Sequence, residues 1–398
     1  MLSTALLVAI TLPALTGPFN VGRVTLHLTD QTRLEPLPSP PTNRELMVDV
    51  WYPAESSSEP IAPYIDAATF EQALGAAGFR RQFSGATDVV REGRIETHAR
   101  LGAPFVRSLR SCPVIVFSPG GGMAKEQYSA QLEDLASQGY IVVAITHTYD
   151  GIVSVFPDGR TVIHDSKRWP TIPSFEGENN LNQLEWHAGD IRFVIDELVR
   201  LSQGRASPPF VQHLDLARIG AFGHSFGGMA AARACQLDRR LRACLNQDGA
   251  EAMKPFRLDA RGWGMDQPFM YITRDAERVA VPDEDIAEMK ITRQQFEQLY
   301  ARLIAARDVA FERTGGGSYL VRLRTAETSH MDFSDLPLLG ARNSSDAEKR
   351  AATLAIIRSY TLAFFDQTVR GKRSTLLEGG NKKELVVAMR RFPPARRR

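Results

Sequence analysis

A serine flanked by glycines is the strongest chemical signal in the sequence. Residues 223–227, Gly-His-Ser-Phe-Gly, match the G-x-S-x-G pattern, with a β-rich run at 218–222 before them and a helical pattern after them. In that context the serine occupies a strained turn between strand and helix, where a Cβ at either glycine would collide with neighbouring backbone. The helix start also favours developing negative charge beside the serine. We call residues 223–227 the elbow, and it predicts Ser225 as a nucleophile rather than part of a structural turn.

A serine hydroxyl needs a general base to become a nucleophile. With this type of elbow the chain order is nucleophile, acid, histidine, and the histidine follows the last strand. His330 fits, because it comes just after the β-rich run 319–323 and no other histidine lies beyond His224. His224 is part of the elbow and is expected to turn away. Earlier histidines are predicted to be solvated or held in the core by hydrogen bonds; they include His147, His164, His187 and His213.

Two aspartates compete to be the acid that orients His330. Asp248 follows the strand predicted after the nucleophile helix, and Asp275 follows the next strand. Both lie between Ser225 and His330 in the chain, so order alone does not choose between them. Either could instead be a loop carboxylate that caps a turn.

A glycine-rich segment follows an earlier buried strand, 114–117. Residues 118–122 read Ser-Pro-Gly-Gly-Gly, and glycines let backbone N–H groups approach a substrate carbonyl. We therefore expect the amides of Gly121 and Phe226 to form an oxyanion hole. The alternative is a plain glycine-rich turn.

Composition excludes several classes of protein. The chain has 398 residues, a formal net charge of +2, 43% hydrophobic and 24% charged residues, which excludes disordered, collagenous and coiled-coil proteins. The near-neutral charge argues against nucleic acid as a partner. The three cysteines have no metal-binding spacing. Cys235 and Cys244 are expected to be small buried residues, because pairing would need Cα atoms within about 7 Å. The predicted chemistry needs neither metal nor organic cofactor.

The elements that must position these residues alternate along the chain. Apolar runs typical of strands covered on both faces alternate with helical patterns, which predicts an α/β fold with a mostly parallel central sheet and helices on both faces. Residues 24–28 and 46–51 alternate as half-exposed strands do, and they predict an antiparallel pair at the N-terminal end of the fold.

The domain prediction is one large domain, residues 16–370, with cap-like insertions near 54–110 and 251–318. Residues 1–15 form an apolar segment, too short for a membrane span, that suggests a signal or anchor remnant and hence export or membrane association. Residues 371–398 are predicted to be a frayed, basic, solvated tail, because they carry Arg390, Arg391 and the run 396–398.

Taken together, four segments resemble platelet-activating-factor acetylhydrolases of the plasma and intracellular type II group and their bacterial relatives. They are Phe-Ser-Pro-Gly-Gly at 117–121, Gly-His-Ser-Phe-Gly-Gly at 223–228, Leu-Asn-Gln-Asp-Gly at 245–249 and Ser-His-Met-Asp-Phe at 329–333. The resemblance runs from about Thr16 to Phe365, and it includes 45–53 and 134–140.

The resemblance implies an α/β-hydrolase fold and the triad acid directly after the strand that follows the nucleophile helix. It therefore assigns that role to Asp248 and leaves Asp275 as runner-up. One departure is that Pro119-Gly120 stands where the family usually has His-Gly. The backbone donor lies further on, so we expect the oxyanion hole to be retained. The segment 276–318 is long, so no preference for acyl length is carried over.

These expectations combine into a serine carboxylic-ester hydrolase. The resemblance implies short-acyl substrates such as the sn-2 acetyl ester of platelet-activating factor or oxidised phospholipids. Alternatives are a cutinase-like or polyester-cleaving hydrolase, which needs an open site, and a non-catalytic binding protein of the same fold. A fourth possibility is a membrane-surface protein that docks through Phe70, Phe79 and Phe83, although core packing is the commoner fate of such residues.

Overall fold

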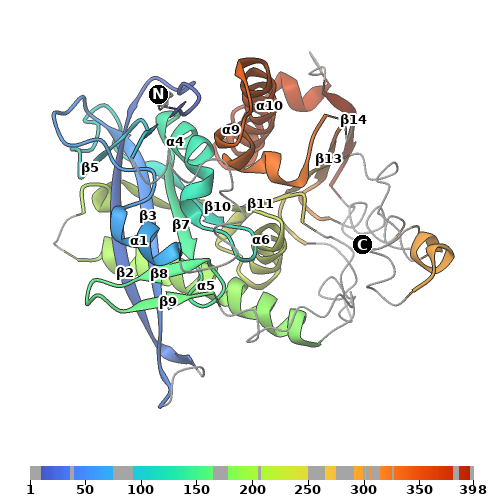
Figure 1. Ribbon diagram of the computed structural model, residues 1–398. Coiled ribbons are helices and arrows are strands. Elements are labelled where there is room, and N and C mark those ends of the chain that lie inside the picture. Colours follow the sequence, from blue (N-terminus) through green and yellow to red (C-terminus); the bar gives the residue numbers. More distant parts are fainter. Residues whose placement is uncertain are drawn as a thin grey trace, which may run out of the picture.

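A computed structural model of the chain describes residues 10–35, 40–74, 93–164, 178–204, 208–249, 265–274, 291–298, 301, 305, 314–324, 327–379 and 385–394. A ten-stranded sheet runs through this part of the chain (Figure 1). In spatial order its strands are β14 (Val386–Phe392), β13 (Ser318–Leu323), β12 (Phe269–Arg274), β11 (Leu241–Gln247), β10 (Leu214–His224), β6 (Cys112–Ser118), β7 (Ile141–Thr146), β3 (Thr42–Ala54), β2 (Asn20–Glu35) and β5 (Ala99–Leu101).

The middle of the sheet is parallel from β13 to β7. Every position of β6 and β7 is buried, which is why their apolar runs are continuous. β2 and β3 pair antiparallel, with Val24 opposite Val50. The predicted antiparallel pair is therefore confirmed, although both strands are longer than the alternating residues indicated.

Helices cover both faces of the sheet (Figure 1). α4 (Ser129–Ser137) and α10 (Ser344–Thr368) bury apolar side chains in one core cluster. α5 (Glu178–Ser202) and α6 (Phe226–Leu237) do so in the cluster on the other face. This is the α/β-hydrolase arrangement that the sequence predicted.

Shorter elements connect these layers. They are β1 (Ile10–Thr11), α1 (Ala67–Ala73), β4 (Ile95–Glu96), η1 (Lys125–Tyr128), β8 (Val153–Val155), β9 (Thr161–Ile163), η2 (Val211–His213), η5 (His330–Phe333), α9 (Leu336–Leu339) and η6 (Thr375–Glu378). Asp66 caps α1 by accepting a hydrogen bond from the Thr69 amide at 2.8 Å. Phe70 on α1 is buried in the core, so it is not a lipid-docking side chain; Phe79 and Phe83 lie outside the described residues.

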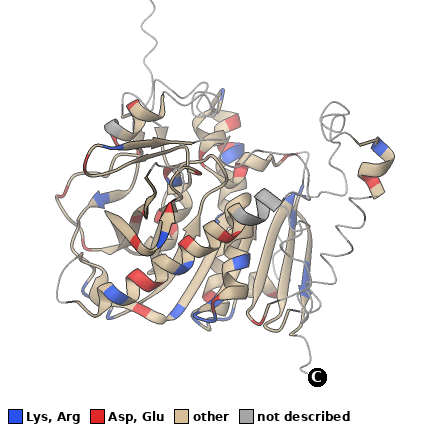
Figure 2. Cartoon of the chain, turned by 90° about the horizontal axis from the view of Figure 1, so that it is seen from below, with Lys and Arg blue, Asp and Glu red and all other residues tan. Residues whose placement is uncertain are grey.

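Two predicted boundaries need correction. Residues 371–398 are not wholly a solvated tail, because β14 completes the sheet by antiparallel pairing with β13. Arg390 and Arg391 are exposed on this strand. Figure 2 shows basic residues on the strands near the C-terminus, whereas charges of both signs are interspersed over the helices. Likewise, the range 251–318 cannot be one insertion, because β12 lies within it and pairs with β11 and β13. The run 396–398 lies outside the described residues.

The N-terminal apolar segment is partly incorporated into the fold. Ile10 and Thr11 pair with Ile95 and Glu96, and Leu12 is buried in the core cluster that also contains α4. Residues 1–9 lie outside the described part of the chain. Within that part, none of the helices combines the length and the apolar character needed to span a membrane.

Cys235 and Cys244 form a disulfide, which corrects the prediction that they are simply small buried residues. Their Cα atoms lie 6.3 Å apart, inside the range that a disulfide can bridge. Cys235 is on α6 and Cys244 is on β11, so the bond ties the helix that follows Ser225 to the strand that precedes Asp248. Cys112 is a buried free thiol.

The buried carboxyl of Asp335 predicts how the stability of the fold depends on pH. Asp335 is fully buried, and burial raises its pKa well above the ordinary value, although hydrogen bonds from the Ala130 amide and Tyr64 hydroxyl oppose the shift. The folded chain therefore favours the neutral carboxyl. Wild-type protein should lose stability relative to Asp335→Asn as the pH rises above about 3.9, the value for an unfolded aspartate, by up to about 1.4 kcal/mol per pH unit.

Urea unfolding at pH 5 and pH 8 measures this difference. We expect Asp335→Asn to gain on the wild type between the two pH values. Asp266→Asn, at a side chain that is 80% exposed, controls for the loss of a carboxylate. A difference between wild type and Asp335→Asn that does not change with pH would contradict the prediction.

Candidate active site

The elbow joins β10 to α6 through a strained backbone. Ser225 has φ 53° and ψ −123°, a conformation that costs free energy for a residue with a Cβ. A Cβ at Gly227 would lie 2.0 Å from the Ser118 carbonyl oxygen, and one at Gly223 would lie 2.3 Å from the Gly227 carbonyl carbon. Only glycine fits at these two positions, which is the steric requirement that the sequence predicted.

The structure brings Ser225, His330 and Asp248 into one hydrogen-bonded chain. Ser225 Oγ lies 3.0 Å from His330 Nε2, and His330 Nδ1 lies 2.7 Å from Asp248 Oδ2. The His330 side chain is 38% exposed and that of Asp248 is 5% exposed. The imidazole thus faces solvent on one side while the carboxylate behind it is shielded, a geometry that can move a proton from the serine to the histidine.

Asp248 is held by groups from the end of β12. Its Oδ1 accepts hydrogen bonds from the Thr273 hydroxyl at 2.8 Å and the Arg274 amide at 3.2 Å, and its Oδ2 accepts one from Arg274 Nε at 2.7 Å. Burial alone would raise the pKa of Asp248, but the hydrogen bond from His330 and the charge of Arg274 outweigh it and lower the pKa to about 2. Asp248 is therefore ionised at any pH near neutrality. Asp275, the runner-up for the acid, lies outside the described residues.

His224 points away from the Ser225 hydroxyl, as expected for a residue inside the elbow. Its Nδ1 lies 2.8 Å from the Tyr128 hydroxyl and its Nε2 lies 2.9 Å from the His330 carbonyl oxygen. Burial and the neighbouring His330 lower the pKa of His224 to about 3. A neutral ring that donates from Nε2 fits these contacts, and it fixes the backbone of His330.

Gly121 and Phe226, the predicted oxyanion donors, lie close together. A Cβ built on Gly121 would be 3.7 Å from the Phe226 Cβ. The amides on either side of Gly121 are already used, since Gly120 donates to the Tyr128 hydroxyl at 3.1 Å and Gly122 donates to the Asp150 carbonyl at 3.0 Å. Phe226 begins α6, where backbone N–H groups have no partner within the helix.

Sequence reasoning missed Thr273 and Arg274, which hold Asp248, and it missed the role of Ser118, which precedes the glycines of 118–122. Thr273 and Arg274 directly precede Asp275, so the strand end that suggested a second acid instead supplies donors to Asp248. Ser118 hydrogen-bonds to His147, which the sequence treated as an ordinary core histidine. The position of Ser118 at the end of a buried strand could have drawn attention to it. No neighbouring residue indicated that His147 is its partner.

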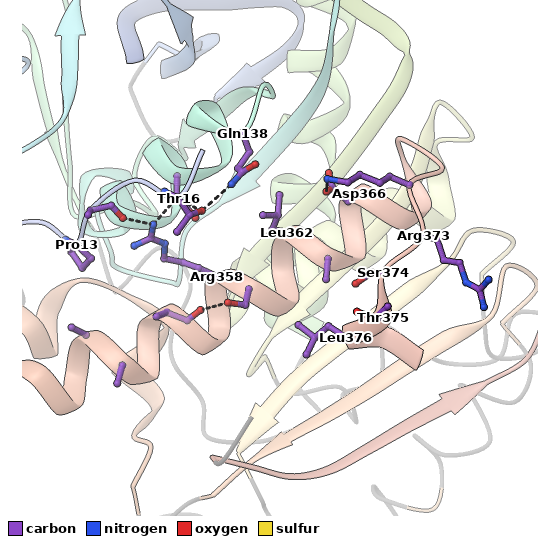
Figure 3. Close-up of a pocket in the computed structure, with 18 residues that line it drawn as sticks. Pro13, Thr16, Gln138, Arg358, Leu362, Asp366, Arg373, Ser374, Thr375 and Leu376 are labelled. Carbon is purple, nitrogen blue, oxygen red and sulfur yellow. Dashed lines mark hydrogen bonds and ion pairs between the residues drawn. The ribbon is translucent and has the colours of Figure 1, made fainter. Parts of the chain in front are cut away.

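A cavity of about 790 Å³ is lined by α10 residues together with Pro13, Ala14 and Leu376 (Figure 3), and none of Ser225, Asp248 or His330 borders it. Among the residues that the structure describes, no group of three or more His, Cys, Asp or Glu side chains could hold a metal ion.

Several known proteins are similar in sequence to part of this chain. A probable 1-alkyl-2-acetylglycerophosphocholine esterase of Arthroderma benhamiae is 28% identical over 250 residues, which cover 60% of this chain and 58% of that protein. The platelet-activating factor acetylhydrolase of Cavia porcellus is 25% identical over 252 residues, which cover 60% of this chain and 55% of that protein. The alignments thus span a little over half the length of these curated relatives.

A solved structure agrees with the fold over nearly its whole length. The ferulic acid esterase from Streptomyces cinnamoneus superposes with a TM-score of 0.73 at 27% identity, covering 96% of this chain and 99% of that one. The family model for platelet-activating factor acetylhydrolase, isoform II, matches residues 5–304, a range that contains Ser225 and Asp248 and ends before His330. Because that match spans most of the chain, the protein belongs to the platelet-activating factor acetylhydrolase isoform II family, as its motifs predicted.

Proposed function

We propose that the protein is a serine carboxylic-ester hydrolase with Ser225, His330 and Asp248 as its catalytic triad. The observation that carries the proposal is the chain of hydrogen bonds from Ser225 Oγ through both ring nitrogens of His330 to Asp248, at 3.0 and 2.7 Å. Family membership and the esterase neighbour support the same reaction class. A non-catalytic binding protein would have no need of a strained serine at the end of this chain.

In the first half of the reaction, Ser225 Oγ attacks the ester carbonyl carbon while His330 Nε2 takes its proton. Asp248 accepts the Nδ1–H bond, keeps the ring in the required tautomer and stabilises the imidazolium. The carbonyl oxygen becomes an oxyanion, held by the Gly121 and Phe226 amides. His330 then gives its proton to the leaving alcohol, and the acyl group remains on Ser225.

The second half repeats these steps with water. His330 Nε2 removes a proton from a water molecule that attacks the acyl carbon, and the same two amides hold the second oxyanion. The Ser225 ester bond breaks, the proton returns from His330 to Ser225 Oγ, and the carboxylic acid leaves. These reaction steps require no protein group other than these side chains and amides.

The proposed substrates are short-acyl esters, with the sn-2 acetyl of platelet-activating factor or oxidised phospholipids as the expected natural class. The curated relatives carry names for acetyl-ester cleavage of this lipid type. The structural neighbour, a ferulic acid esterase, favours an ester of a hydroxycinnamic acid as the second candidate substrate. Surface contact with a membrane is part of the proposal only for the lipid substrate.

An ester panel separates these candidates. We expect turnover of p-nitrophenyl acetate to exceed that of the butyrate and octanoate, and hydrolysis of 2-acetyl phospholipid vesicles to exceed that of methyl ferulate. A preference for methyl ferulate would favour the hydroxycinnamate-ester alternative. A rise in kcat/KM with chain length would shift the proposal toward a lipase or a polyester-cleaving enzyme.

We also propose that the protein acts in an oxidising compartment outside the cytoplasm. The disulfide between Cys235 and Cys244 supports this, because such bonds persist in oxidising compartments and are rare in the cytosol. Alkylation of native protein from the source cells, followed by mass spectrometry, should find Cys235 and Cys244 blocked as a disulfide. Two free thiols at these positions would overturn the proposal.

A further inference from the structure

A second chain of serine, histidine and aspartate lies behind the glycine-rich loop, residues 118–122. Ser118 Oγ is 2.8 Å from His147 Nε2, and His147 Nδ1 is 2.8 Å from Asp190 Oδ2. The three residues come from the end of β6, the residue after β7 and the helix α5. Ser118 and Asp190 are fully buried and His147 is 1% exposed, so no substrate can reach this hydroxyl and the chain cannot repeat the chemistry of Ser225.

The far end of this chain is anchored by buried charge. Asp190 receives Arg44 Nε at 3.0 Å and Arg44 Nη2 at 2.6 Å, and Arg44 Nη1 reaches Glu35 at 2.6 Å. Bidentate pairing of this kind fixes a carboxylate in both position and orientation. Burial and the adjacent His187 lower the pKa of His147 to about 4, so the ring is neutral. It donates a hydrogen bond from Nδ1 to Asp190, and its Nε2 accepts a hydrogen bond from the Ser118 hydroxyl.

Ser118, the first residue of this hydrogen-bonded series, belongs to the loop that carries Gly121. Ser118 closes β6, and its carbonyl oxygen lies against the elbow so tightly that a Cβ at Gly227 would be only 2.0 Å away. Because the loop and the elbow touch through their backbones, a displacement of Ser118 changes the spacing between the Gly121 and Phe226 amides.

A ring contact links the same histidine to the other expected donor. His147 stacks on His187 with ring centroids 3.8 Å apart and planes inclined by 7°. The His187 ring meets the Phe226 ring edge-on, at 5.0 Å and 86°. His147 therefore reaches Gly121 through Ser118 and reaches Phe226 through His187.

We propose that the Ser118–His147–Asp190 chain is a positioning device that holds the Gly121 amide, relative to that of Phe226, at the distance the tetrahedral oxyanion requires. The inference rests on the ester hydrolysis proposed above. Ser118 and His147 are positioning residues, because neither touches the substrate. Their loss should therefore weaken binding of the transition state far more than binding of the ground state.

Ser118→Ala tests this with Ser137→Ala as its matched control. Both serines are fully buried and each donates to one acceptor. Ser137 donates to the Asp134 carbonyl within α4 and also accepts from the Gly17 amide. With p-nitrophenyl acetate, Ser118→Ala should lower kcat by about 10- to 100-fold, somewhat less than complete loss of an oxyanion donor, and leave KM within about twofold of wild type. Active-site titration with a fluorophosphonate normalises each rate to the folded fraction.

An alkyl trifluoromethyl ketone supplies a readout that a merely structural role would not move. Its hemiketal oxyanion occupies the hole, so its Ki should rise in Ser118→Ala by the same factor as kcat falls. His147→Gln, whose amide oxygen can still accept the Ser118 proton, should lose less than Ser118→Ala. It also keeps the inference testable if the serine variant folds poorly.

The two proposals fail in distinguishable ways. If Ser118→Ala keeps kcat and the ketone Ki within about twofold of wild type, or changes them no more than Ser137→Ala does, the positioning role is overturned while ester hydrolysis stands. If Ser225→Ala is as active as wild type, the proposed function itself is overturned.

Discussion

Ser225→Ala is expected to lower kcat for p-nitrophenyl acetate by about 10⁴-fold or more, because loss of a triad nucleophile leaves only the contribution of substrate binding and the oxyanion hole. The substitution retains the Cβ, so the strained backbone at φ 53° is unchanged and the fold should be preserved. The variant should also resist labelling by a fluorophosphonate probe, since the labelled oxygen is absent.

Ser137→Ala serves again as the control for loss of a buried serine hydroxyl. It should label normally and retain turnover close to that of wild type. If Ser225→Ala were still labelled, or kept more than about a tenth of wild-type turnover, another nucleophile would be responsible and the reaction proposed here would be wrong.

Asp248→Asn is expected to lower kcat by about 10³- to 10⁴-fold. Asp248 accepts from Thr273, Arg274 and His330, and an asparagine can offer only its one oxygen. Arg274 Nε and His330 Nδ1 both meet Oδ2, whereas the Thr273 hydroxyl and the Arg274 amide both meet Oδ1, so the asparagine NH₂ must face donors at one of the two positions. In either orientation the negative charge that orients His330 and stabilises its imidazolium is lost, so His330 takes the Ser225 proton less readily.

Asp275→Asn is the matched comparison, because both aspartates satisfied the chain order that the sequence allowed. It should retain activity within a few-fold of wild type. Rates are compared between pH 6 and pH 8, where Asp248, with its pKa of about 2, stays ionised in wild-type protein. An inactive Asp275→Asn beside an active Asp248→Asn would reverse the assignment of the acid.

Local sterics explain why so much of this site could be predicted from the sequence. The elbow depends on neighbours in the chain, since Gly223 and Gly227 are required wherever a strand turns into a helix this sharply. The buried runs in β6, β7 and β10 depend on burial of both strand faces. The place of His330 after the last parallel strand follows from topology, which the alternating pattern of strands and helices already indicated.

Only the tertiary structure decided the features that depend on distances between separate elements. Chain order left Asp248 and Asp275 equivalent, and only the family resemblance favoured Asp248. The register of β11 and β12 then placed Thr273 and Arg274 against Asp248. The disulfide between Cys235 and Cys244 depended on a Cα separation of 6.3 Å. The sequence analysis missed β14 because Arg390 and Arg391 are typical of a solvated tail. Backbone pairing with β13 does not depend on the charge of these exposed side chains.

The buried Ser118–His147–Asp190 chain shows the same limit most clearly. Its members lie on three elements, and they are 29 and 43 residues apart in sequence. No periodicity connects them, and each residue alone is an ordinary buried polar side chain. The sequence by itself predicted Ser225 as nucleophile, His330 as base and the fold that carries them, because those predictions follow from local backbone geometry, chain order and hydrophobic burial. The side chains that hold Asp248 and the support beneath the glycine loop depend on the packing of strands and helices that meet only in the folded chain.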